Sequence, residues 1–103
     1  MIDRIIYHIT STSEWNLAQS KGEYEPRQFP DEGFIHCSYS HQLETVVNRF
    51  FLGQKNLLVL EIDSAVLQCE VIEENLEGGA ELYPHVYGKL PLNAILSYRS
   101  LDI

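Results

Sequence analysis

Three short stretches of this 103-residue chain carry the side chains best suited to chemistry. They are YHIT with His8, GFIHCS with His36 and Ser38, and ELYPHVYG with Glu81 and His85. Imidazole and carboxylate groups transfer protons, and burying them without partners costs several kcal/mol. We therefore expect these groups to pair with one another or to face a cavity.

The three stretches are rich in β-branched and aromatic residues and predict strands over residues 2–9, 33–38 and 80–88. Successive side chains of a strand point to opposite faces, so each strand presents one polar set. The sets are His8; Phe34, His36 and Ser38; and Glu81, Tyr83, His85 and Tyr87. We expect them to converge on one cleft.

Aromatic side chains accompany these polar groups along the chain. Trp15, Phe34 and Tyr83 could stack on a planar ligand, because aromatic rings commonly line ligand sites. Aromatic residues at such spacings also form ordinary protein cores. Their positions in the sequence leave both roles open.

The remaining pattern predicts helices at the front of the chain and between the strands. Ser11 and Glu14 have the spacing of a capping box, which predicts a short helix that ends near Gly22. Residues 21–31 are polar and contain two prolines, so they predict a loop that could act as a lid, with one edge strand around Tyr24. Apolar residues at helical spacing predict an amphipathic helix over residues 40–51, with Ser40 as its N-cap.

Apolar and β-branched runs predict the other strands. The continuous run at residues 57–62 is typical of a central strand that is buried on both faces. Residues 69–74 and 93–101 are predicted to form two more strands. Together the elements predict an α+β domain with a mixed or split antiparallel sheet.

Length and charge limit the classes of protein to consider. A chain of this length predicts a single domain over residues 1–103. The net charge of −8 opposes binding to nucleic acid, since phosphates attract clustered Lys and Arg. No apolar run is long enough to span a membrane and no secretory signal is recognisable, so we expect a soluble, cytoplasmic protein.

Metal binding and cysteine catalysis are poorly supported by the spacing of the residues. His8, His36, His85 and Glu81 have suitable ligand atoms for zinc, but no HExxH or HxH pair presents two ligands from one element. We therefore expect no metal. Cys37 follows His36 directly, and adjacent strand residues point to opposite faces, so the two are not expected to act as a catalytic pair.

Four segments together resemble a known family along nearly the whole chain. They are IYHIT, DEGFIHCS, LLVLEID and GGAELYPHVYGKLPLNAI, and the sequence is similar to the domain of unknown function 952 family. That family is uncharacterised biochemically and is grouped by resemblance with the ADP-ribosyltransferase-like superfamily, which binds NAD. The resemblance implies an α+β fold with a split β-sheet and two or three short helices.

The resemblance also implies roles for individual residues. It implies that His8 holds the nicotinamide ribose, that His36 and Ser38 flank the nicotinamide, and that Glu81 is the catalytic carboxylate. His8, His36 and Glu81 are thus the catalytic candidates. The residues expected to contact NAD are His8, Trp15, Phe34, Ser38, Tyr83 and His85.

Two histidine blocks are also similar to those of RNA 2′-phosphotransferases of the same superfamily. Those enzymes hold phosphates with arginines, whereas Pro30, Asp31 and Glu32 precede His36 here, and an RNA phosphate is not the expected substrate. Arg4 and Arg27 could meet a pyrophosphate or lie at the surface. The leading hypothesis is a protein that binds NAD or an ADP-ribose derivative in this cleft and could transfer ADP-ribose or cleave a glycosidic bond. The alternatives are a non-catalytic small-molecule or peptide-binding module and a protein that acts through its surface.

Overall fold

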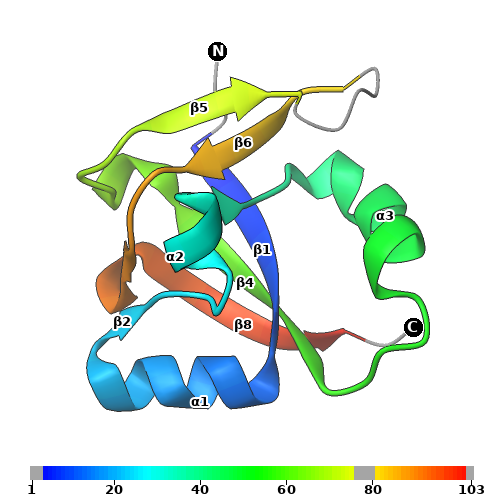
Figure 1. Cartoon of the computed structure of the whole chain (residues 1–103), viewed down its shortest axis with the longest axis horizontal. Coiled ribbons are helices and arrows are strands. Elements are labelled where there is room, and N and C mark those ends of the chain that lie inside the picture. The colour runs from blue at the N-terminus through cyan, green and yellow to red at the C-terminus, as the bar shows by residue number, and fades with distance from the viewer. Residues whose placement is uncertain (1–3, 76–80, 102–103) are drawn as a thin grey trace.

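The computed structural model describes residues 4–75 and 81–101, and these form a mixed α+β fold of small sheets and short helices (Figure 1). The first two residues of the strand predicted over 2–9, and the first residue of that predicted over 80–88, lie outside the described residues. None of the described helices is long and apolar enough to cross a membrane.

The first sheet holds the longest strands. It consists of β1 (Ile5–Ser11), β4 (Leu57–Asp63) and β8 (Ile95–Leu101), in the antiparallel order β1-β4-β8. The prediction of a central strand at residues 57–62 is confirmed, because β4 lies between two neighbours and is almost entirely buried. His8 on β1 is paired with Leu60 on β4.

The second sheet brings together strands that are distant in the sequence. It consists of β3 (Ile35–His36), β6 (Tyr83–Val86) and β5 (Val71–Glu74), in the antiparallel order β3-β6-β5. Backbone hydrogen bonds between Tyr7 and Ser38, of 2.8 and 2.7 Å, join the second sheet to β1. A two-stranded sheet of β2 (Glu23–Tyr24) and β7 (Leu90–Pro91) completes the set, so the predicted edge strand around Tyr24 is confirmed.

The first helix agrees with its sequence signals. α1 (Thr12–Lys21) begins after Ser11, whose hydroxyl accepts a hydrogen bond of 3.1 Å from the backbone of Glu14. It ends at Gly22, where φ is +88°, a value that favours glycine. The predicted loop at residues 21–31 overlaps a short helix, α2 (Phe29–Glu32), which tolerates Pro30 because the first turn of a helix does not use its backbone N–H groups.

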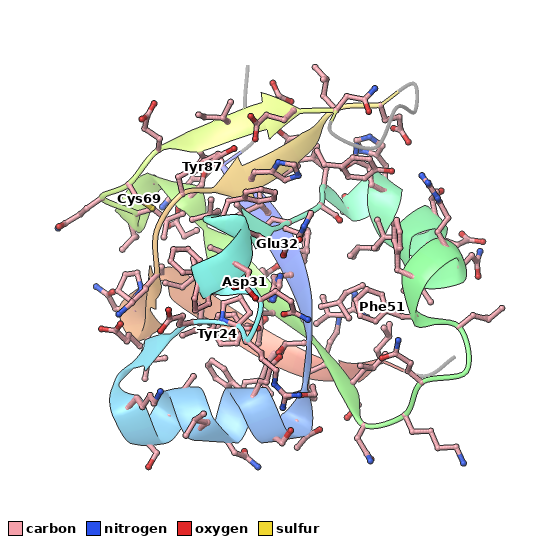
Figure 2. All side chains as sticks on the ribbon, viewed as in Figure 1. Tyr24, Asp31, Glu32, Phe51, Cys69 and Tyr87 are labelled. Carbon is pink, nitrogen blue, oxygen red and sulfur yellow. The ribbon has the colours of Figure 1, made fainter. Side chains whose placement is uncertain are left out.

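The amphipathic helix expected over residues 40–51 is not one regular helix. It consists of a 3₁₀ turn η1 (Ser40–Gln42), α3 (Leu43–Val46) and a π turn η2 (Val47–Phe51). The expected N-cap is wrong by one residue, since Tyr39 precedes the first turn and its backbone donates to the Gln42 side chain at 3.0 Å. The π turn points Phe51 toward β1 (Figure 2).

Two apolar clusters fill the interior. The larger lies between the sheets and includes Ile6, Ile35, Leu60 and Val86, each with no exposed surface. The smaller lies between the first sheet and the helical segment 40–51, and its buried residues are Ile9, Val47, Leu57 and Val59. Two short 3₁₀ turns complete the fold: η3 (Ser64–Val66) lies between β4 and β5, and η4 (Leu92–Ala94) lies between β7 and β8.

Candidate functional site

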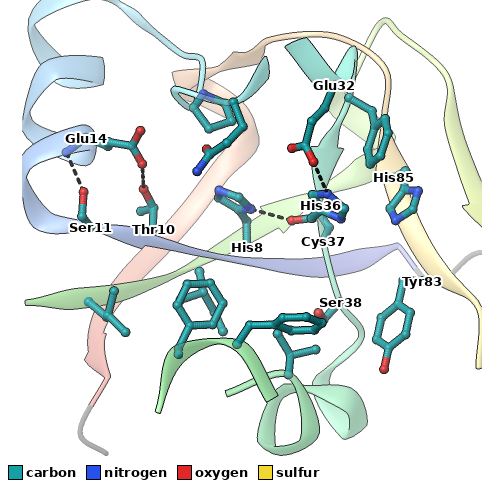
Figure 3. A pocket seen from close by; sticks show the side chains of 18 of the residues that line it. His8, Thr10, Ser11, Glu14, Glu32, His36, Cys37, Ser38, Tyr83 and His85 are labelled. Carbon is teal, nitrogen blue, oxygen red and sulfur yellow. Dashed lines mark hydrogen bonds and ion pairs between the residues drawn. The ribbon is translucent and has the colours of Figure 1, made fainter. Parts of the chain in front are cut away.

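A cavity of about 670 Å³ opens where β1 meets the second sheet (Figure 3). This volume is in the usual range for small-molecule sites. Six residues that the sequence analysis expected at the site line the cavity: His8, Phe34, His36, Ser38, Tyr83 and His85.

Strand pairing explains this convergence. His36 on β3 lies directly opposite His85 on β6, so both side chains share one face of the second sheet. Ser38 pairs with Tyr7, and this contact sets His8 beside the end of β3. Three segments that are far apart in the sequence therefore meet at one cavity.

The remaining two predicted site residues, Trp15 and Glu81, do not line this cavity. Trp15 is buried, with 6% of its surface exposed, and packs against Tyr98 with ring centroids 5.3 Å apart. Glu81 precedes the first residue of β6, so the strand alternation used for Tyr83 and His85 does not extend to it. Its carboxylate lies 3.7 Å from His41 in an exposed ion pair.

Three other carboxylates line the cavity instead: Glu14 from α1, Glu32 from α2 and Glu74 from β5. Figure 3 shows Glu14 on one side of His8 and Glu32 on the other. Sequence reasoning identified Glu14 only as a helix-capping residue and gave no role to the other two. The one sequence feature that could have identified such a carboxylate was the position of Glu32, four residues before His36.

His85 is held by Glu74 in an arrangement typical of a catalytic base and its orienting carboxylate. The Nδ1 atom of His85 lies 2.9 Å from Oε1 of Glu74, and the Tyr87 hydroxyl donates to the same oxygen. These donors, Tyr87 first and then His85, lower the pKa of the Glu74 carboxyl. An ionised Glu74 favours the tautomer of His85 that carries its proton on Nδ1.

His36 stands at the mouth of the cavity within a cluster of rings. Its Nε2 lies 3.2 Å from Oε2 of Glu32, and both side chains are about half exposed. The ring of Phe34 lies 4.7 Å from that of His36 and stacks on His85 at 4.4 Å, centroid to centroid. The centroids of His36 and His85 are 5.0 Å apart.

His8 is buried behind this cluster, and both of its ring nitrogens have partners within the protein. Nδ1 lies 2.6 Å from the His36 carbonyl oxygen, which can only accept, so Nδ1 carries a proton. Nε2 lies 2.7 Å from the hydroxyl of Tyr24. Burial lowers the pKa of His8 to about 4, which keeps the ring neutral at pH 7.

The hydrogen bonds continue from His8 to the opposite wall of the cavity. The Tyr24 hydroxyl lies 2.8 Å from Oγ1 of Thr10, and Thr10 donates to Oε2 of Glu14 at 3.2 Å. The other oxygen of Glu14 accepts from the backbone of Arg27 at 2.8 Å. This network anchors the His36 backbone to α1.

Metal ligation and thiol chemistry have no structural support in the described residues. Across residues 4–75 and 81–101, no group of three or more His, Cys, Asp and Glu side chains could hold a metal ion. Cys37 is 2% exposed, and burial raises the pKa of its thiol. Arg4 forms two hydrogen bonds with Asp63, of 2.9 and 2.8 Å, and does not line the cavity.

The fold and site define a class of mixed α+β proteins with a cavity lined by histidine and glutamate where two small sheets meet. The chain belongs to the family described as Protein of unknown function (DUF952), which matches residues 9–98. It is similar to the crystal structure of Protein CC0527 from Caulobacter crescentus, with 31% identity, a TM-score of 0.85, and coverage of 96% of this chain and 87% of that chain. The solution NMR structure of CC0527 has 31% identity, a TM-score of 0.82 and coverage of 98% and 87%, respectively. No curated protein matches the chain.

Proposed function

We propose that this protein binds NAD or a related ADP-ribose derivative in the cavity, within an ADP-ribosyltransferase-like fold. The observation that carries the proposal is the convergence of His36, His85, Phe34 and Tyr83 on one cavity of ligand size. Rings of this kind suit a planar nicotinamide, and hydrogen-bonding groups beside them suit ribose hydroxyls.

The two ends of NAD fit the cavity unequally. The aromatic rings and the carboxylates of Glu32 and Glu74 suit the nicotinamide riboside end, whose pyridinium ring carries positive charge. A pyrophosphate is usually bound by Arg, Lys or a helix N-terminus. No Lys or Arg among the described residues lines the cavity, and the first turn of α1, whose cap Ser11 lines it, carries the acidic Glu14. The proposal therefore concerns the nicotinamide end of the ligand.

NAD would bring a glycosidic bond whose cleavage develops positive charge on the ribose. A carboxylate stabilises such charge when it lies close to the reacting carbon. Glu81, the candidate from sequence, lies outside the cavity lining, so we assign this role to Glu32 at the cavity mouth.

His85 is the proposed general base. With its Nδ1 proton directed at Glu74, its Nε2 is the basic nitrogen that would accept a proton from an attacking water or hydroxyl group. His8 has both ring nitrogens engaged, so its proposed role is to position the backbone of His36.

Calorimetric titration with NAD tests binding. We expect saturable binding that is weakened in the His36→Ala and His85→Ala variants and retained in His41→Ala, which removes an exposed histidine outside the cavity lining. Absence of binding at millimolar NAD would contradict the proposal.

Release of nicotinamide tests catalysis separately. We expect turnover that Glu74→Gln lowers more than it lowers NAD binding, because Glu74 is the carboxylate that orients the proposed base but only one of three that line the cavity. Saturable binding of NAD without any release would favour the non-catalytic binding module.

A further inference from the structure

The charge of the cavity wall is unusual for a site that takes a nucleotide. Three carboxylates line it, from Glu14, Glu32 and Glu74, and no Lys or Arg among the described residues does. The whole chain has the same sign, with a net charge of −8. Clefts lined by one sign of charge attract ligands of the opposite sign and repel those of the same sign.

The neighbours of these carboxylates do not cancel this charge. The ion-pair partners of Glu32 and Glu74 are His36 and His85, which are charged only when protonated. Glu14 accepts hydrogen bonds from Thr10 and from a backbone amide, both of which are neutral donors. His8, the third histidine of the wall, is buried and neutral at pH 7.

Aromatic faces lie beside this negative wall. Phe34 stacks on His85 with ring centroids 4.4 Å apart, and Tyr83 lines the same part of the cavity. Rings attract cations through the negative charge above their faces, and the attraction strengthens where water is excluded. A carboxylate set beside aromatic rings is a suitable environment for an organic cation.

The other wall of the cavity is apolar. Phe50, Phe51, Val46 and Leu57 line it, together with Ile9 from β1. Phe51 extends from η2 toward β1, and in Figure 3 side chains of carbon alone lie on the other side of the β1 ribbon from His8 and His36. The ligand that matches both walls has an uncharged flat or apolar part as well as its positive charge.

We infer that the cavity recognises an organic cation with a planar apolar body, of the N-alkylpyridinium class, rather than the anionic pyrophosphate part of a nucleotide. The inference rests on the proposed function, since the nicotinamide riboside end of NAD belongs to this class. It adds that the positive charge, and not the pyrophosphate, is the feature recognised. We therefore expect higher affinity for a ligand whose ring is positively charged than for the matching ligand whose ring is neutral.

Matched pairs of ligands test the inference by calorimetric titration at pH 7.5. NAD⁺ and NADH differ in the charge of the nicotinamide ring, as do 1-methylnicotinamide and nicotinamide. We expect each cation to bind about five- to tenfold more tightly than its neutral partner. ADP-ribose, which lacks the ring and keeps the pyrophosphate, is expected to bind more weakly than NAD⁺.

Charge removal at the cavity mouth provides the matched variants. Glu32→Gln keeps the shape of a half-exposed side chain, and we expect it to reduce the preference for the cation by about two- to fivefold. Glu44→Gln makes the same change on an exposed position outside the cavity lining and is expected to leave the preference unchanged.

The outcomes separate this inference from the proposed function. Equal affinities within both ligand pairs, or tighter binding of ADP-ribose than of NAD⁺, would overturn the inference while the proposed function stands. Binding of 1-methylnicotinamide without binding of NAD⁺ would support the inference and contradict the proposed function. Absence of binding by every probe would overturn both.

Discussion

The buried hydroxyl of Tyr24 offers the sharpest test of how the site is held together. Tyr24 has no exposed surface, and its hydroxyl lies 2.7 Å from His8 Nε2 and 2.8 Å from Thr10 Oγ1. Tyr24→Phe removes this one oxygen and keeps the ring in place. The substitution therefore isolates the hydrogen bonds from the packing.

The expected loss of stability can be worked out from the two partners. Thr10 keeps its hydrogen bond to Glu14, whereas His8 Nε2 loses the only partner that the described residues supply. Leaving a buried polar atom unsatisfied costs about 1–3 kcal/mol. We expect Tyr24→Phe to lower the free energy of unfolding by about 2 kcal/mol in urea denaturation at pH 7.

A matched control distinguishes this effect from a general sensitivity to tyrosine substitution. Tyr98 is 53% exposed, and Tyr98→Phe should change the free energy of unfolding by less than about 0.5 kcal/mol. If Tyr24→Phe cost no more than Tyr98→Phe, the network from His8 to Glu14 would not contribute to stability. The reasoning that His8 positions His36 through this network would then be refuted.

Three further outcomes follow from the structure. Burial lowers the folded-state pKa of His8 to about 4, below its unfolded value of about 6.5, so the unfolded chain binds the extra proton between these pH values. The stability contributed by neutral His8 is thus present above pH 6.5, and the free energy of unfolding decreases by about 3 kcal/mol as the pH falls toward 4. His8→Gln should reduce this dependence of the free energy of unfolding on pH, measured by urea titration. Gly22→Ala should lower the free energy of unfolding by about 1 kcal/mol, because φ at Gly22 is +88°; an unchanged value would show that the helix end adjusts. Cys37→Ser should cost about 1–3 kcal/mol by placing a hydroxyl in the core, while Cys37→Ala should cost less; the reverse order would indicate that the hydroxyl finds a partner.

Local sequence signals predicted the elements with clear physical causes. The Ser11 cap and Gly22 mark the ends of α1, and the apolar run that begins at Leu57 is the central strand β4. The segment at residues 40–51 was harder to predict. Its apolar spacing indicates a helix, but the periodicity does not reveal the change from 3₁₀ to α to π turns.

Residue type and strand alternation predicted which histidines line one cavity. His36 and His85 lie on strands, so their faces follow from a period of two, and the structure sets them opposite each other. The same alternation did not predict the position of Glu81. It lies two residues before β6 begins, and side chains outside a strand need not follow its alternation.

The sequence alone determined the polar groups available, the acidic charge and the alternation that turns His8 and His36 toward a shared side. Tertiary structure decided which carboxylates join them. Glu14 comes from a helix, Glu32 from a short turn of helix inside a predicted loop, and Glu74 from the strand paired with β6. Contacts among such distant segments depend on strand order and packing, which local periodicity does not encode. The negative charge of the cavity, and with it the inferred preference for a cation, therefore became visible only in the folded protein.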